Sequence, residues 1–195
     1  MLEAFSIKSI YHAINFISFP VMLIALLVSW KSINTRCLLL ILATIELIDT
    51  ITAEIAFHWG SYYYLWAFLN CWVYAYAVFG RRSIVKRFQK YSQFCKDVYE
   101  NFYFTKQEGA LLFIYFSYMI VTFIALIELS FFYLDLIGSV PYLRHAFSPL
   151  LTFFCLLESI VILWLATRTV PIDEHVLAIK HARKMQKNNH FNKRE

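Results

Sequence analysis

Residues 110–127 read ALLFIYFSYMIVTFIALI, a stretch without a single charged side chain. An apolar run of about 18 or more residues is long enough to cross about 30 Å of hydrocarbon as a helix. The run stays apolar as far as Leu136, apart from Glu128 and Asp135. The stretch Ala110–Leu136 therefore predicts a membrane-spanning helix.

Other parts of the chain repeat this pattern. Further apolar runs of similar length are Tyr11–Trp30, Cys37–His58, Tyr62–Phe79 and Pro149–Thr167. Hydrophobic residues make up 60 % of the chain, against roughly 45–50 % in ordinary soluble domains. Because a soluble chain of this length has no core large enough to bury that excess, we predict an all-α integral membrane protein. The prediction is a multi-pass protein of the cell (inner or plasma) membrane with five spans.

The distribution of Lys and Arg predicts the orientation. With the amino terminus outside and the carboxyl terminus in the cytoplasm, all of the 18 Lys and Arg residues except Lys8 and Arg144 are cytoplasmic, which follows the positive-inside rule. A four-span alternative, in which the run Cys37–His58 does not cross, keeps nearly the same bias. The predicted organisation is spans one to three (1–80), a basic cytoplasmic segment (81–109), spans four and five (110–168) and a basic, helical cytoplasmic tail (169–195).

The second predicted span is unusual because it carries Glu46, Asp49 and Glu54. Near the bilayer centre each carboxylate costs about 2.5–3.5 kcal/mol on the insertion scale, whereas each large aliphatic residue returns only about 0.3–0.6 kcal/mol. No Lys or Arg lies within a predicted span to neutralise these acids. The helix must therefore be sheltered by its neighbours, face water, or hold its acids protonated.

The polar positions of the second span follow a regular spacing. Those that recur every four residues, and so form one polar ridge along a helix, are Glu46, Thr50, Glu54 and His58. Asp49 flanks the ridge, and Glu128 and Glu158 of other spans are candidate partners. In one interpretation the ridge lines a hydrated path for cations or protons. In the other, protonated acids and threonines hydrogen-bond between helices and only hold the bundle together.

Five membrane-spanning helices of one chain can hardly enclose a path wide enough for ions. A path for ions therefore predicts a homo-oligomer with the second helix near its axis. The third span offers a packing surface, since Ala67, Cys71 and Ala75 recur every four residues and small residues let membrane helices approach closely. The same span holds nine aromatic residues between Tyr62 and Phe79, which we expect to face lipid.

Basic residues follow the third span, where residues 81–90 read RRSIVKRFQK. Apolar residues continue in steps of three and four as far as Phe102, which predicts one cytoplasmic amphipathic helix within Arg81–Lys106. The cations at its beginning are Arg81, Arg82, Lys86, Arg87 and Lys90. Such a helix either lies on the anionic inner leaflet of the membrane or docks a cytosolic protein.

The sequence contains no HExxH motif, glycine-rich phosphate loop or nucleophile elbow, so we predict no enzymatic activity, cofactor or metal site. It also lacks a motif that reads a nucleic-acid groove, and we expect the basic tail to face lipid instead. Two hypotheses of function remain. The first is a homo-oligomeric ion or proton pathway. The alternative is a membrane anchor or sensor that recruits a cytosolic partner through its basic loop and tail, as small proteins of bacterial multi-component systems do, antiviral ones included.

Overall fold

The computed structural model describes residues 18–167, together with residues 178 and 182. Among these residues the chain is helical and has no strand, which confirms the all-α class. In chain order the helices are the segment 18–28, η1 (Ser29–Lys31), α2 (Ile33–Phe57), α3 (Tyr62–Phe79), α4 (Arg81–Phe88), α5 (Gln93–Glu100), α6 (Lys106–Tyr133), α7 (Pro141–His145) and α8 (Phe147–Thr167). The start of the first predicted span and, apart from residues 178 and 182, the tail predicted over 169–195 lie outside the described residues.

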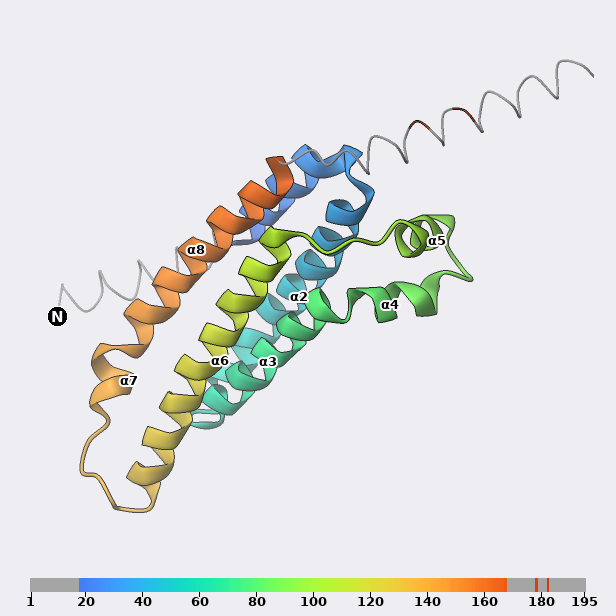
Figure 1. Cartoon of the computed structure of the whole chain (residues 1–195). Coiled ribbons are helices and arrows are strands. Elements are labelled where there is room, and N and C mark those ends of the chain that lie inside the picture. Colours follow the sequence, from blue (N-terminus) through green and yellow to red (C-terminus); the bar gives the residue numbers. More distant parts are fainter. Residues whose placement is uncertain (1–17, 168–177, 179–181, 183–195) are drawn as a thin grey trace, which may run out of the picture.

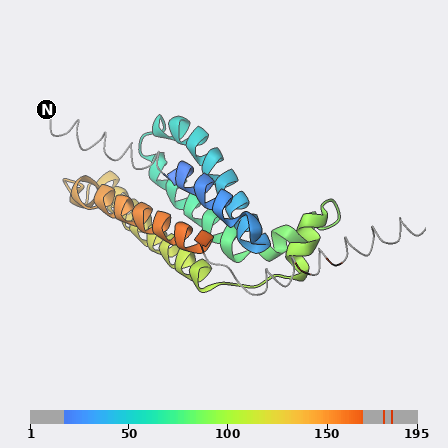
Figure 2. The ribbon, with the colours of Figure 1, turned by 90° about the horizontal axis from the view of Figure 1, so that it is seen from above.

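The long helices α2, α3, α6 and α8 run along a common axis and form a bundle (Figure 1). Contacts join α2 to α3, α3 to α6 and α6 to α8, so that the bundle is built around α3 and α6. The α2–α3 connection and the loop after α6 lie at one end, while η1, α4 and α5 lie at the other. Seen from above, α4 and α5 project to one side of the bundle (Figure 2).

Polar caps decide where the long helices begin. Ser32 precedes α2, and its hydroxyl oxygen accepts a hydrogen bond from the Thr35 backbone N–H at 3.3 Å. Thr105 and Glu108 form a capping box at the start of α6, in which each side chain accepts a hydrogen bond from the other residue's N–H. Both helices therefore begin four residues before their predicted apolar runs, because the caps are polar residues upstream of those runs.

The core of the bundle lies where α3 crosses α6. Tyr74 of α3 and Tyr115 of α6 are buried there, and the partly buried Phe68 packs against the same cluster. The small-residue ridge of α3 contributes to this core, because Ala75 is buried and Cys71 packs against the same cluster. Ala67, the third member of the ridge, is half-buried.

Two helices in the described part of the chain, α6 and α8, are long and apolar enough to cross a membrane. They coincide with the predicted spans Ala110–Leu136 and Pro149–Thr167. The helix α2 has the length, but its three carboxylates lower its mean hydropathy, and α3 is rich in tyrosine. The segment Ser18–Lys31 is apolar but shorter. Five spans and their orientation therefore stay predictions.

The single amphipathic helix predicted within Arg81–Lys106 is wrong. The chain forms two short helices there, α4 and α5, separated by a turn in which the N–H groups of Tyr91 and Ser92 both donate to the Phe88 carbonyl oxygen. Folding back lets Val85 of α4 and Val98 of α5 be buried together. The apolar stripe that looked continuous in the sequence is thus divided between two helices that pack on each other.

Candidate functional site

Two acids of α2 are hydrogen-bonded to side chains of α3. The Asn70 amide donates to Asp49 Oδ1 at 2.5 Å, and the Tyr74 hydroxyl donates to Glu46 Oε2 at 2.5 Å. Asp49 and Glu46 are three residues apart on α2, and Asn70 and Tyr74 are four apart on α3, so each pair lies about one helical turn apart. Because the helices are antiparallel neighbours, the two pairs form successive rungs between them.

A third acid lies on the other side of the core. The Tyr115 hydroxyl of α6 donates to Glu158 Oε1 of α8 at 2.7 Å. The rings of Tyr115 and Tyr74 are in contact, with centroids 5.3 Å apart and planes tilted by 35°. A continuous set of side chains thus crosses the bundle from α2 to α8. We call it the carboxylate–tyrosine cluster: Glu46, Asp49, Asn70, Tyr74, Tyr115 and Glu158.

The cluster lies in apolar surroundings. Tyr74, Tyr115 and Glu158 are buried, with 8 %, 2 % and 8 % of their surface exposed, whereas Glu46 and Asp49 are half-buried. In the part of the chain that the structure describes, no Lys or Arg forms an ion pair with any of these acids. The cluster therefore gathers three carboxyl groups whose hydrogen-bond donors are the neutral side chains of tyrosine and asparagine.

The other members of the predicted ridge lie apart from the cluster. Thr50 is exposed, and its hydroxyl donates to the Glu46 backbone carbonyl at 2.8 Å within the same helix. His58 is exposed and caps the carboxyl end of α2. Glu54 lies in α2, but its side chain is outside the described part of the structure. Among the predicted pathway residues of α2 whose side chains the structure describes, Glu46 and Asp49 are therefore the two that accept hydrogen bonds from side chains of α3.

Glu128 has a different partner from the one expected. Its two carboxylate oxygens accept hydrogen bonds from the backbone N–H groups of Tyr142 and Leu143, each at 2.8 Å. These N–H groups belong to the first turn of α7, which has no intrahelical acceptor for them. Glu128 therefore holds α7 against the end of α6, and its place among the pathway acids stays a prediction.

The sequence interpretation missed Asn70, Tyr74 and Tyr115. Tyr74 also corrects the expectation that the aromatic residues of α3 face lipid, because it points into the core. A signal for Asn70 was present, since it is an amide within an apolar run and lies four residues before Tyr74. Such a pair occupies one helix face and can meet two acids at a similar spacing on a neighbour. For Tyr115, which lies among other aromatic residues of α6, the sequence offered no such signal.

The predicted surface cations divide into two groups. Arg82, Lys86, Arg87 and Lys90 are exposed. Arg81 is not, since its side chain is fully buried and its guanidinium Nη1 lies 2.8 Å from Glu108 Oε1. It also donates to the backbone carbonyl oxygens of Asn34 and Tyr103, at 3.2 and 3.1 Å. Arg81 is therefore no contact for lipid or a partner, and its assignment to the surface set is wrong.

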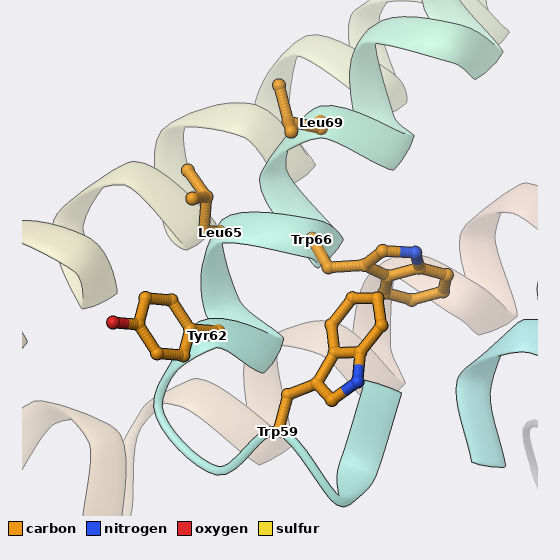
Figure 3. Close-up of a pocket in the computed structure, with 5 residues that line it drawn as sticks. All are labelled: Trp59, Tyr62, Leu65, Trp66 and Leu69. Carbon is orange, nitrogen blue, oxygen red and sulfur yellow. The ribbon is translucent and has the colours of Figure 1, made fainter. Parts of the chain in front are cut away.

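A shallow apolar groove of about 300 Å³ lies near the α2–α3 connection (Figure 3). It is lined by Trp59, Tyr62, Leu65, Trp66 and Leu69, and Figure 3 shows the two indole rings beside each other. The groove shares no residue with the carboxylate–tyrosine cluster. Tryptophan and tyrosine at a helix end are typical of the membrane–water interface.

Among the described residues, no group of three or more His, Cys, Asp and Glu side chains is placed to hold a metal ion. By fold and site the chain is thus a helical bundle with two helices that could cross a membrane and a buried cluster of carboxyl and phenol groups. No family model, curated protein or solved structure matches the chain. Function is therefore inferred from the side chains themselves.

Proposed function

We propose that the chain is a multi-pass membrane protein of the cell (inner or plasma) membrane. Two observations support this proposal. The helices α6 and α8 have the length and hydropathy of membrane spans. In addition, large apolar side chains are exposed along all four long helices, among them Ile51 of α2, Trp72 of α3, Phe113 of α6 and Ile160 of α8. Apolar surface of this extent is costly in water and favourable in lipid.

We further propose that the carboxylate–tyrosine cluster is the site at which protons or small cations bind on a pathway through this membrane. The observation that supports it is the gathering of Glu46, Asp49 and Glu158 between the long helices, where no Lys or Arg of the described residues forms an ion pair with them. Intramembrane carboxyl groups that lack a basic partner are typical of proton relays and ion paths. In this pathway the carboxyl groups bind and release the proton, while Tyr74 and Tyr115 hold Glu46 and Glu158 in position.

The geometry favours a path inside one protomer over a path along an oligomer axis. Glu46 and Asp49 are bonded to α3, whereas the exposed face of α2 carries Leu47, Ile51 and Ile55. An axis lined by Leu47, Ile51 and Ile55 would be apolar. In a homo-oligomer, each protomer is therefore expected to contain its own proton path.

Proton flux through reconstituted vesicles tests this proposal. We expect vesicles that contain the wild-type protein to dissipate an imposed pH gradient faster than protein-free vesicles. Glu46→Gln should reduce this flux at least about tenfold, because the amide keeps the hydrogen bond from Tyr74 but cannot exchange a proton. The measurement is the fluorescence of a pH-sensitive dye trapped in the vesicles.

Glu100→Gln is the matched control. Glu100 is exposed on α5, outside the four helices that carry the cluster, and pairs with Lys96 at 4.0 Å. The same chemical change at Glu100 should leave the flux unaltered. If wild-type and Glu46→Gln vesicles conduct equally, the pathway proposal is wrong.

Cysteine labelling tests the proposed orientation. Ser83 of α4 and Ser139 in the loop before α7 are both exposed and lie near opposite ends of the bundle. In a background without the native cysteines, a membrane-impermeant reagent applied to intact cells should label Ser139→Cys and leave Ser83→Cys unlabelled. Labelling of both positions from the same side would contradict a membrane-crossing α6.

A membrane anchor or sensor is the second candidate function. It is favoured by α4 and α5, which project from the bundle and expose several cations (Figure 2). In this alternative the segment 81–109 recruits a cytosolic partner and the cluster only holds the helices together. Retention of a cytosolic protein that depends on α4, with no proton flux from the wild type, would favour the anchor.

A further inference from the structure

The helices α4 and α5 form a small unit fixed to one end of the bundle (Figures 1 and 2). Val85 of α4 and Val98 of α5 are buried together with Ile33 and Cys37 of α2. Arg81, at the start of α4, is bound to the first turn of α6 by its ion pair with Glu108. Contacts with both α2 and α6 therefore fix the position of the unit relative to the bundle.

The unit begins where the exposed aromatic surface of α3 ends. Trp72, Tyr76 and Phe79 are all exposed, and α4 starts at Arg81 after the single residue Gly80. A side chain at Gly80 would be crowded, because an added Cβ would lie 2.8 Å from the Tyr76 carbonyl oxygen. Aromatic residues at the end of an apolar helix are typical of the membrane–water interface. The start of α4 is thus expected at the depth of the lipid headgroups.

The outer surface of the unit is basic. Its exposed cations lie on α4 and the turn after it: Arg82, Lys86, Arg87 and Lys90. In the described part of the chain none of them forms an ion pair with a carboxylate. On α5, Glu100 pairs with Lys96, and Asp97 is buried. Arg82 lies over the rings of Tyr99 and Phe102. The exposed Lys86, Arg87 and Lys90 are therefore available to a partner outside the protein.

Two large aromatic side chains stand among these cations. Phe88 and Tyr91 lie at the turn between α4 and α5, with 55 % and 87 % of their surface exposed. They alternate along the chain with Arg87 and Lys90. Aromatic residues next to basic ones are the composition of segments that lie in the headgroup layer, with rings toward the acyl chains and cations on the phosphates.

We propose that the exposed surface of α4 and its turn binds the anionic lipid headgroups of the adjacent leaflet. The contacting residues are Arg82, Lys86, Arg87, Phe88, Lys90 and Tyr91. The exposed rings of Phe88 and Tyr91 among these cations, close to the exposed aromatic end of α3, favour lipid over a soluble acidic protein. Lipid binding at this surface is independent of the proton pathway, so either proposal can fail without the other.

The test uses the full-length protein in vesicles of phosphatidylglycerol and phosphatidylcholine. Spin-labelled lipids report the preference of the protein for the anionic lipid, and amide hydrogen exchange reports the protection of residues 81–92. Each Lys or Arg near an anionic surface contributes about fivefold to binding. Replacing Arg82, Lys86, Arg87 and Lys90 by glutamine should therefore reduce the anionic preference at least about tenfold. It should also remove the extra protection of residues 81–92 in anionic vesicles.

A matched variant distinguishes the effect of this surface from the effect of the total positive charge of the protein. Lys31, Lys96, Lys106 and Arg144 are exposed cations outside α4, and replacing them by glutamine removes the same total charge. We expect this variant to keep most of the lipid preference and all of the local protection. Equal effects of the two variants would overturn the proposal. So would an α4 variant that keeps its lipid preference but loses a co-purifying cytosolic protein, because the surface would then bind that protein.

Discussion

Arg81→Met is expected to lower the free energy of unfolding by about 3–5 kcal/mol, the cost of removing one partner of a buried ion pair. The Arg81 guanidinium is fully buried at 2.8 Å from Glu108, which is itself only 1 % exposed. Methionine keeps much of the apolar volume but leaves Glu108 in the core without its cation. It also removes the donors to the carbonyl oxygens of Asn34 and Tyr103. Unfolding of the detergent-solubilised protein, followed by circular dichroism, measures the loss.

The neighbouring arginine provides the control. Arg82 is exposed, and its guanidinium lies over the rings of Tyr99 and Phe102, so Arg82→Met should change the free energy of unfolding by less than about 1 kcal/mol. Adding Glu108→Gln to Arg81→Met should recover part of the loss, because it removes the uncompensated charge. Equal losses from the two arginine variants would show that the ion pair does not hold the α4–α5 unit in place.

The fold was predictable where a local pattern determines it. The helix α3 spans the predicted range Tyr62–Phe79, because a run without charged residues lies between Gly60 and Gly80. The pairing of α4 with α5 was not predictable from the same kind of pattern. An apolar stripe that faces lipid and one that folds back on itself have the same spacing, and the difference lies in contacts of Val85 and Val98 with α2.

The acidic residues of the candidate site could be predicted from the sequence, but their hydrogen-bond partners could not. Glu46, Asp49 and Glu158 stand out in the sequence because carboxylates in apolar runs are rare. Their donors on neighbouring helices depend on which helices pack together and in which register, and no local spacing contains that information. The same reason explains Arg81, whose partner Glu108 lies beyond both short helices in the sequence. Its side chain was therefore placed at the surface with the cations that follow it.

Substitutions at Glu158 and Tyr115 are expected to separate proton transport from helix packing. Glu158→Gln keeps an oxygen that can accept the Tyr115 hydrogen bond, so the fold should be retained while the proton flux falls at least about tenfold. Glu158→Leu removes the acceptor and leaves the Tyr115 hydroxyl buried without a partner. An unsatisfied buried hydroxyl costs about 1–3 kcal/mol, and this cost should appear in the free energy of unfolding.

The double variant Tyr115→Phe with Glu158→Leu completes the cycle. It removes both the hydroxyl and the carboxyl group, so its stability should exceed that of Glu158→Leu by about 1–3 kcal/mol, since no unpaired polar group remains. If the cluster carries protons, this stable double variant should still conduct no better than Glu158→Gln. Flux and unfolding are measured on the same preparations, so that a loss of folded protein is not mistaken for a loss of transport. A double variant that is both stable and fully conductive would mean that Tyr115 and Glu158 serve only to join α6 to α8.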